Sequence, residues 1–274
     1  MAVTPSIADF DRDTAVAPAG DGVWSATVSD QWAVPRGPNG GYIAALVLRA
    51  MEAQVADPAR APRSLTLHYL RPPAPGPCEL HIIVERAGRT LTSLGARMVQ
   101  EDRTMVVALG AFAADFPTVA DYATPAPAVG PPPAALHTVP DGPGVPPIAR
   151  RTAMAPVFGP GPMSGGDEAL VGGWLRLAQP RIADAAALAF YCDAWLPAPF
   201  ARLTVPAPAP TVDLTIHFRT RLPHPDMAPG DPVLARFSST TSHGGFFEED
   251  GEIWAPDGTL LAQSRQLALL FPGG

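Results

Sequence analysis

The sequence predicts an α+β fold with two similar halves, and three observations lead to this prediction. The chain has 274 residues with 35 Pro and 25 Gly, yet 47% of its residues are hydrophobic, so it can bury a large core. Its prolines gather in residues 117–147, where they forbid a helix interior or a central strand at almost every step. On each side of that segment, an apolar helix precedes a run of alternating strands. We therefore expect an N-terminal domain over 1–116, a linker over 117–147 and a C-terminal domain over 148–274.

Each half is predicted to contain one buried helix. In the first half the helix covers residues 42–55, which are rich in Ala and Leu, and Asn39 stands before it as a candidate N-cap. In the second half it covers residues 184–195, which are apolar nearly all round. A helix without a polar face is buried rather than amphipathic, so both helices belong to the core.

The strand that follows each helix has nearly the same sequence in both halves. Residues 64–72 read Ser-Leu-Thr-Leu-His-Tyr-Leu-Arg-Pro, and residues 213–219 read Asp-Leu-Thr-Ile-His-Phe-Arg. Further strands are expected at 78–86, 91–100 and 105–112, and at 233–241, 245–255 and 259–271. The pattern in each half is thus a helix wrapped by a curved antiparallel sheet.

Charge and cysteine content exclude several classes of function. All 19 basic residues are Arg, they form no cluster, and with 26 acidic residues the net charge is -7, so nucleic acid is not an expected partner. No run of about 18 apolar residues occurs, and residues 1–13 lack the pattern of a signal peptide, so we expect a cytoplasmic protein without membrane insertion. Cys78 and Cys192 are too few for a disulfide framework or a thiolate metal site.

Common catalytic and cofactor motifs are missing as well. The chain has no H-E-x-x-H or C-x-x-C metal motif and no G-x-G-x-x-G or phosphate-binding loop, so neither a metal nor a cofactor is expected. It also lacks the G-x-S-x-G nucleophile elbow of the α/β-hydrolases.

A set of short motifs then points to one family. They are, in chain order, Arg36-Gly37-Pro38-Asn39-Gly40-Gly41-Tyr42, Leu67-His68-Tyr69-Leu70-Arg71-Pro72, Arg86-Ala87-Gly88-Arg89-Thr90, Tyr191-Cys192-Asp193, Thr211-Val212-Asp213 and Gln266. Their order and spacing resemble the double-hotdog acyl-CoA thioesterases of the bacterial type II (TesB-like) family, over most of the chain outside the linker. The resemblance implies a tandem hotdog fold, hydrolysis of acyl-CoA to a free fatty acid and CoA, and a homo-oligomer, commonly a dimer of double hotdogs.

The resemblance also implies a water held by an Asp, a Thr and a Gln, with no covalent intermediate. The matching positions are Asp193, Thr211 and Gln266. By its own sequence context, Asp193 lies late in an apolar helix, where a carboxylate is costly unless it is hydrogen-bonded or functional. The alternative is a carboxylate that reaches solvent near Pro197. Asp213 could equally supply the carboxylate.

Strand alternation predicts the faces on which Gln266 and Thr211 lie. Gln266 shares a face with the small residues Ala262, Ser264 and Ala268, so its amide has room to project into a cavity and hold a water. The alternative is an ordinary solvent-facing Gln. Thr211 is expected on the same face as Asp213, and it could also be a plain strand-opening residue. Matching Asp102 with Asp257 aligns Gln266 with Ala111, so chemistry is expected only in the second half.

Asn39, Gly40 and Gly41 form a candidate substrate-binding segment at the start of the first helix. Glycines let a ligand approach the backbone, and free N–H groups there could bind a thioester oxyanion or CoA oxygens. The alternative is a plain capped helix start. A hotdog hydratase or dehydratase would need a catalytic His at this point, and a non-catalytic acyl-binding protein is the remaining alternative.

Overall fold

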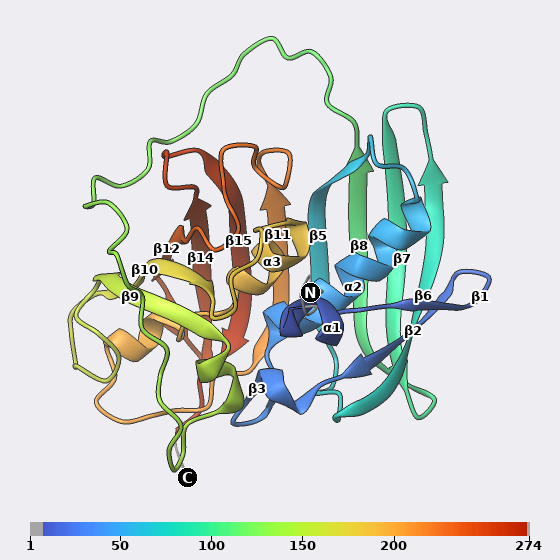
Figure 1. Cartoon of the computed structure of the whole chain (residues 1–274). Helices are drawn as coiled ribbons and strands as arrows, with labels where there is room; N and C mark the ends of the chain where they lie inside the picture. The colour runs from blue at the N-terminus through green and yellow to red at the C-terminus, as the bar shows by residue number, and fades with distance from the viewer. Residues whose placement is uncertain (1–7, 273–274) are drawn as a thin grey trace, which may run out of the picture.

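The computed structural model describes residues 8–272 and contains one large antiparallel sheet that both halves build together (Figure 1). Its thirteen strands run in the order β1-β2-β6-β7-β8-β5-β11-β15-β14-β12-β10-β9, with β13 paired to β14. The first half supplies β1 (Ala17–Gly20), β2 (Val23–Val28), β5 (Ala61–Tyr69), β6 (Gly76–Ala87), β7 (Leu91–Gln100) and β8 (Arg103–Ala113). The second supplies β9 (Thr152–Phe158), β10 (Ala169–Leu177), β11 (Thr211–Phe218), β12 (Val233–Ser239), β13 (Ser242–His243), β14 (Phe246–Trp254) and β15 (Leu260–Leu269). A small hairpin of β3 (Ala33–Val34) and β4 (Gly37–Pro38) lies outside this sheet.

The two strands with matching sequences lie side by side where the halves meet. β5 and β11 are antiparallel neighbours, and their register places Thr66 opposite Thr215. The two hydroxyl oxygens lie 3.1 Å apart. Thr66 and Thr215 occupy the same place in the repeated sequence, and the two strands run in opposite directions from this pair. An approximate two-fold axis at Thr66 and Thr215 therefore relates the two halves.

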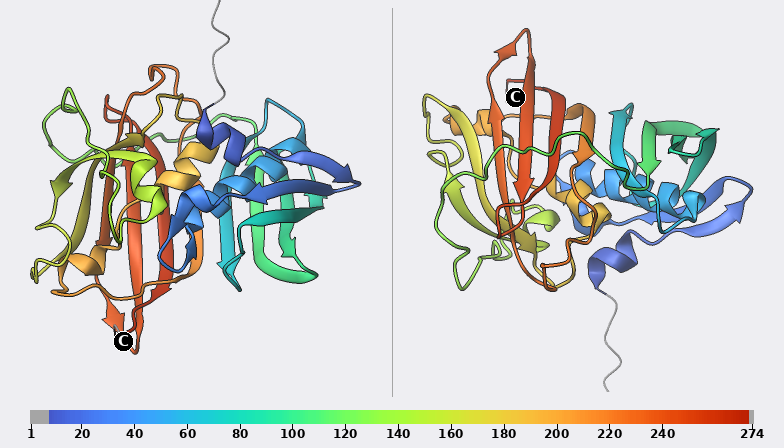
Figure 2. Two further views of the ribbon diagram at one scale, coloured as in Figure 1. Left: turned by 60° about the horizontal axis from the view of Figure 1, so that its bottom comes forward. Right: turned by 90° about the horizontal axis from the view of Figure 1, so that it is seen from above.

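Two buried helices lie on one face of this sheet, which curves around them (Figure 2). α2 (Gly40–Val55) is buried along most of its length and begins two residues before the predicted start. α3 covers only Ala185–Tyr191, with Asp184 as its N-cap, so the predicted extension to residue 195 was wrong. The reason is local: the N–H groups of Asp193 and Ala194 bond three residues back, to Phe190 and Tyr191, which tightens and ends the helix. Asp193 therefore lies in a turn after α3 and not inside it.

The remaining helical pieces are short. They are α1 (Asp9–Asp13), η1 (Asp30–Trp32), η2 (Pro147–Arg150) and η3 (Ala198–Ala201). No helix among residues 8–272 is long and apolar enough to cross a membrane.

One hydrophobic core extends through both halves and includes residues of α2, α3 and the inner face of the sheet. A smaller cluster of Trp174, Leu234 and Trp254 is covered by linker residues such as Val129 and Leu136. Between β8 and η2 the chain has no helix or strand beyond a bridge from His137 to Met154, and it crosses the molecule as a long loop (Figure 1). The division into domains at 1–116, 117–147 and 148–274 stays a prediction.

Candidate active site

Asp193 lies where the end of α3 meets the start of α2. Its Oδ2 accepts hydrogen bonds from the Gly41 N–H and from Asn39 Nδ2, both at 3.0 Å. Asn39 Nδ2 also lies 2.6 Å from the Asp193 carbonyl oxygen. Burial raises the pKa of Asp193 to about 6 although these hydrogen bonds lower it. The carboxylate is therefore held by neutral donors and titrates closer to neutral pH than an exposed Asp.

The glycines at the start of α2 allow this close approach. A Cβ on Gly41 would lie 2.5 Å from the Phe190 carbonyl oxygen, and a Cβ on Gly40 would lie 2.9 Å from Asp193 Oδ2. Asn39 is the N-cap, as predicted, since its side chain accepts from the Tyr42 N–H at 2.9 Å. In the predicted substrate-binding segment of Asn39, Gly40 and Gly41, the N–H groups of Asn39 and Gly41 thus already donate within the protein, to the Trp32 carbonyl oxygen and to Asp193.

Gln266 is buried on the inner face of β15, with only 5% of its surface exposed. Its neighbours on that face are the buried Ala262, Ser264 and Ala268, so the predicted alternation is confirmed. Thr211 Oγ1 donates to Gln266 Oε1 at 3.0 Å. The structure thus brings two of the three predicted catalytic residues into direct contact.

Thr211 and Asp213 do not share a face, in contrast to the expectation from simple alternation. The pairing of β11 with β15 is irregular between these residues: Thr211 lies opposite the buried Ala268, whereas Asp213 lies opposite the exposed Leu267. The irregularity turns Thr211 toward Gln266. Asp213 remains on the outer side of the sheet, opposite His68 on β5, and its Oδ1 accepts from the Leu267 N–H at 3.3 Å.

The residue before Asp193 contacts the strand that carries Gln266. Cys192, which precedes it, is hydrogen-bonded to Ser264, two residues from Gln266 on the same strand face. No hydrogen bond in the described part of the chain joins Asp193 directly to Thr211 or Gln266. Two of the three predicted residues thus touch each other, and the third is held by the start of α2.

Glu249 is a further buried residue at this site, and the sequence reasoning missed it. Glu249 lies opposite Gln266 in the pairing of β14 with β15, and it is 5% exposed. Gln266 Nε2 donates to Glu249 Oε1 at 2.7 Å, and the Ala198 N–H donates to Oε2. Burial, with the charges of Asp193 and Glu248, raises the pKa of Glu249 to about 7. The signal was present in the sequence, because alternation from Phe247 places this acid on the apolar face of its strand.

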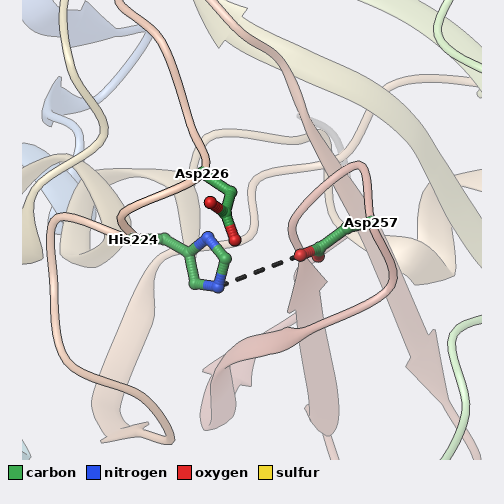
Figure 3. Close-up of side chains that lie close together, drawn as sticks. All are labelled: His224, Asp226 and Asp257. Carbon is green, nitrogen blue, oxygen red and sulfur yellow. Dashed lines mark ion pairs between the residues drawn. The ribbon is translucent and has the colours of Figure 1, made fainter.

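A separate cluster of His224, Asp226 and Asp257 has the donor atoms for a metal ion. One such atom from each residue lies within 4.8 Å of the others, and one nitrogen with two carboxylate oxygens would suit a divalent cation. Figure 3 shows His224 Nε2 facing Asp257, at 4.0 Å from Oδ2. Asp257 precedes β15, and about 20 Å of strand separate the start of β15 from Gln266. This cluster therefore lies apart from the candidate active site, and no spacing motif marks it because Asp257 joins His224 and Asp226 only in the fold.

Family models match both halves of the chain. The model described as the acyl-CoA thioesterase C-terminal domain matches residues 123–270, which is more than half of the sequence, and the one described as the N-terminal domain matches residues 28–113. No curated protein matches the chain.

Solved structures show the same fold over nearly the whole length. A conserved protein of unknown function with a hot dog fold from Alicyclobacillus acidocaldarius is 26% identical, with a TM-score of 0.87 over 98% of this chain and 100% of its own. A protein of Thermobifida fusca, provisionally named a thioesterase II, is 27% identical with a TM-score of 0.82, over 98% and 99% of the two chains. The acyl-CoA thioesterase II TesB2 of Mycobacterium marinum is 18% identical, with a TM-score of 0.75 over 97% and 99%. The predicted double hotdog fold is thus confirmed.

Proposed function

This chain belongs to the acyl-CoA thioesterase family and hydrolyses acyl-CoA to a free acid and CoA, and from that premise we propose that Asp193, Thr211 and Gln266 hold the attacking water. In the proposed reaction, the water oxygen bonds to the thioester carbonyl carbon and the C–S bond breaks. The water gives up one proton to Asp193, and the leaving CoA thiolate takes up a proton. No covalent bond to the protein forms.

Asp193 is proposed as the general base. The observation that carries this role is its partly buried carboxylate, held by the Gly41 N–H and Asn39 Nδ2, with a pKa raised to about 6. A base with a pKa near the working pH combines a large ionised fraction with useful basicity. Asn39 and Gly41 support catalysis in this proposal by holding Asp193, so the first half contributes to the site although it carries no catalytic residue of its own.

Thr211 and Gln266 are proposed to orient the water. The proton of the Thr211 hydroxyl is committed to Gln266 Oε1, which leaves the lone pairs of Thr211 Oγ1 to accept from a water. The second hydrogen on Gln266 Nε2 is available to a water oxygen or to the thioester oxygen. These two groups therefore offer one acceptor and one donor on the inner face of the sheet.

The experiment is release of free thiol from a panel of acyl-CoA substrates, with Asp193→Ala and Gln266→Ala as test variants. We expect release by the wild type and a large loss in both variants. Equal release by all three proteins would refute the site assignment, and no release from any acyl-CoA would favour an acyl-binding protein. Acyl chain length is read from the same panel.

We also propose that the protein acts in the cytoplasm as a dimer of double hotdogs. The outer face of the first half supports a second copy as partner: the exposed Ile83 and Leu109 flank Gly95 across β6, β7 and β8. Because covering exposed apolar side chains stabilises a complex, this row is a suitable interface. Light scattering after size-exclusion chromatography measures the mass, and a monomer would contradict this assembly.

A further inference from the structure

We propose that Glu249 is a positioning residue that fixes the direction of the hydrogen bonds in the Thr211–Gln266 pair. This inference rests on the proposed roles of Thr211 and Gln266. It concerns a residue outside the predicted catalytic set, and it follows from the order of donors and acceptors around the Gln266 amide.

An amide side chain can occupy its site in two orientations, which exchange the oxygen and the nitrogen. Glu249 decides between them. An ionised carboxylate only accepts, so it must face the Gln266 nitrogen, and Nε2 does donate to Glu249 Oε1 at 2.7 Å. The Gln266 oxygen then faces Thr211 and accepts the hydroxyl proton at 3.0 Å.

The Glu249 carboxylate is itself held in one position. Its second oxygen accepts from the Ala198 N–H at the start of η3, so the carboxylate is fixed between η3 and β15. The two charges that act on it are both acidic: Asp193, which follows α3, and Glu248, its neighbour in sequence on the other face of β14. In the described part of the chain, Glu249 forms no ion pair with an Arg. A buried carboxylate without a cation is costly, and its two donors, Ala198 and Gln266, are the groups that compensate for it.

The direction of these hydrogen bonds decides which groups the attacking water meets. With Glu249 as acceptor, Thr211 presents lone pairs and Gln266 presents one N–H to the space in front of them. With the amide reversed, Gln266 Nε2 would donate to Thr211 Oγ1 and the free N–H would point differently. With Glu249 ionised, that orientation would set two acceptor oxygens against each other, but with an amide at position 249 the reversed site would be fully hydrogen-bonded and would still present the wrong groups to water.

Glu249→Gln creates this reversed state. The new amide can turn its oxygen to the Ala198 N–H, and its nitrogen then faces Gln266, which must present oxygen. Gln266 Nε2 would in turn donate to Thr211, so every buried polar group keeps a partner. We expect a melting temperature equal to or above that of the wild type, KM within about twofold, and kcat lower by about 10- to 100-fold, the cost of misplaced catalytic groups.

The matched control is Glu252→Gln, which removes an acid from the opposite face of the same strand, where Glu252 lies 3.5 Å from Arg236. We expect wild-type kcat and KM from this variant. Wild-type kcat and an unchanged pH profile in Glu249→Gln would overturn the proposal. If Gln266→Ala is fully active too, the proposed catalytic site is also refuted. If Glu249→Gln is fully active and Gln266→Ala is not, only the role of Glu249 is refuted.

A second measurement uses the wild-type protein, in case Glu249→Gln does not fold. Because both Asp193 and Glu249 must be ionised for the proposed arrangement, log kcat plotted against pH should fall with a slope above one on the acid side. A slope of one throughout that range would overturn the role of Glu249. In Glu249→Gln, a folded variant should show the single slope that Asp193 alone produces.

Discussion

The backbone N–H of Gly41 donates to the carboxylate of Asp193 at 3.0 Å, and this contact joins two residues 152 positions apart in the chain. Gly41 belongs to the first half and Asp193 to the second. The approach is possible because position 41 has no side chain: a Cβ there would lie 3.1 Å from the Cβ of Asp193. Neither half alone could therefore hold this carboxylate in its observed position.

The first prediction separates the two candidate carboxylates. Asp193→Asn keeps an oxygen that can accept from the Gly41 N–H but removes the base, so we expect kcat to fall by about 10²- to 10⁴-fold with little change in KM. Asp213→Asn, on the outer side of the sheet, should keep most of the activity. Steady-state thiol release measures both, and the reverse result would assign the base to Asp213.

The second prediction concerns the Thr211 hydroxyl. Thr211→Ser keeps the donor to Gln266 Oε1 and should retain activity within about threefold, whereas Thr211→Val leaves that oxygen unpaired. Loss of a hydrogen bond in the transition state costs about 1–3 kcal/mol, which corresponds to roughly 5- to 150-fold in kcat/KM. Equal activity of the Val and Ser variants would show that the hydroxyl has no part in catalysis.

The third prediction tests the contact between the helices. Gly41→Ala would place a methyl group 2.5 Å from the Phe190 carbonyl oxygen, so the helices must move apart. Overpacking of this kind costs about 1–3 kcal/mol in the free energy of unfolding, measured by urea denaturation. Gly130→Ala is the control, because no atom lies within 4 Å of its added Cβ. If both variants unfold at the same urea concentration as the wild type, the close packing at Gly41 does not contribute to the free energy of unfolding.

The fourth prediction is a pH dependence of stability that arises from Glu249. Its pKa is raised from 4.5 to about 7 by burial, so between these values the folded protein binds more protons than the unfolded chain. Stability from this group is therefore highest at acid pH and falls as the pH rises through 7. Between pH 5 and pH 8 the loss is on the order of 2 kcal/mol.

Glu249→Gln should lack this contribution. The difference in unfolding free energy between pH 5 and pH 8, measured in the wild type and in this variant, isolates the Glu249 carboxyl from all other titrating groups. An identical pH dependence in both proteins would mean that Glu249 has an ordinary pKa in the folded state.

Local sequence patterns determined much of this protein. Alternating hydrophobic residues identified β5 to β8, β11, β12, β14 and β15, but not β1, β2, β9 or β10. The same alternation placed Gln266 on the inner face of β15, and the sequence 91–100 matches β7 residue for residue. The Asn before the first helix identified its N-cap. These features depend on residues only a few positions apart, whose side-chain direction follows from the period of the helix or strand.

Only the tertiary structure decided how the site is assembled. The register irregularity that separates Thr211 from Asp213 depends on pairing with β15, and the early end of α3 directs Asp193 to the start of α2. The role proposed for Glu249 depends on the pairing of β14 with β15, which places Gln266 opposite it. Periodicity along one segment assigns a face, but hydrogen bonds between residues far apart in sequence depend on sheet register and helix packing, which no local pattern encodes.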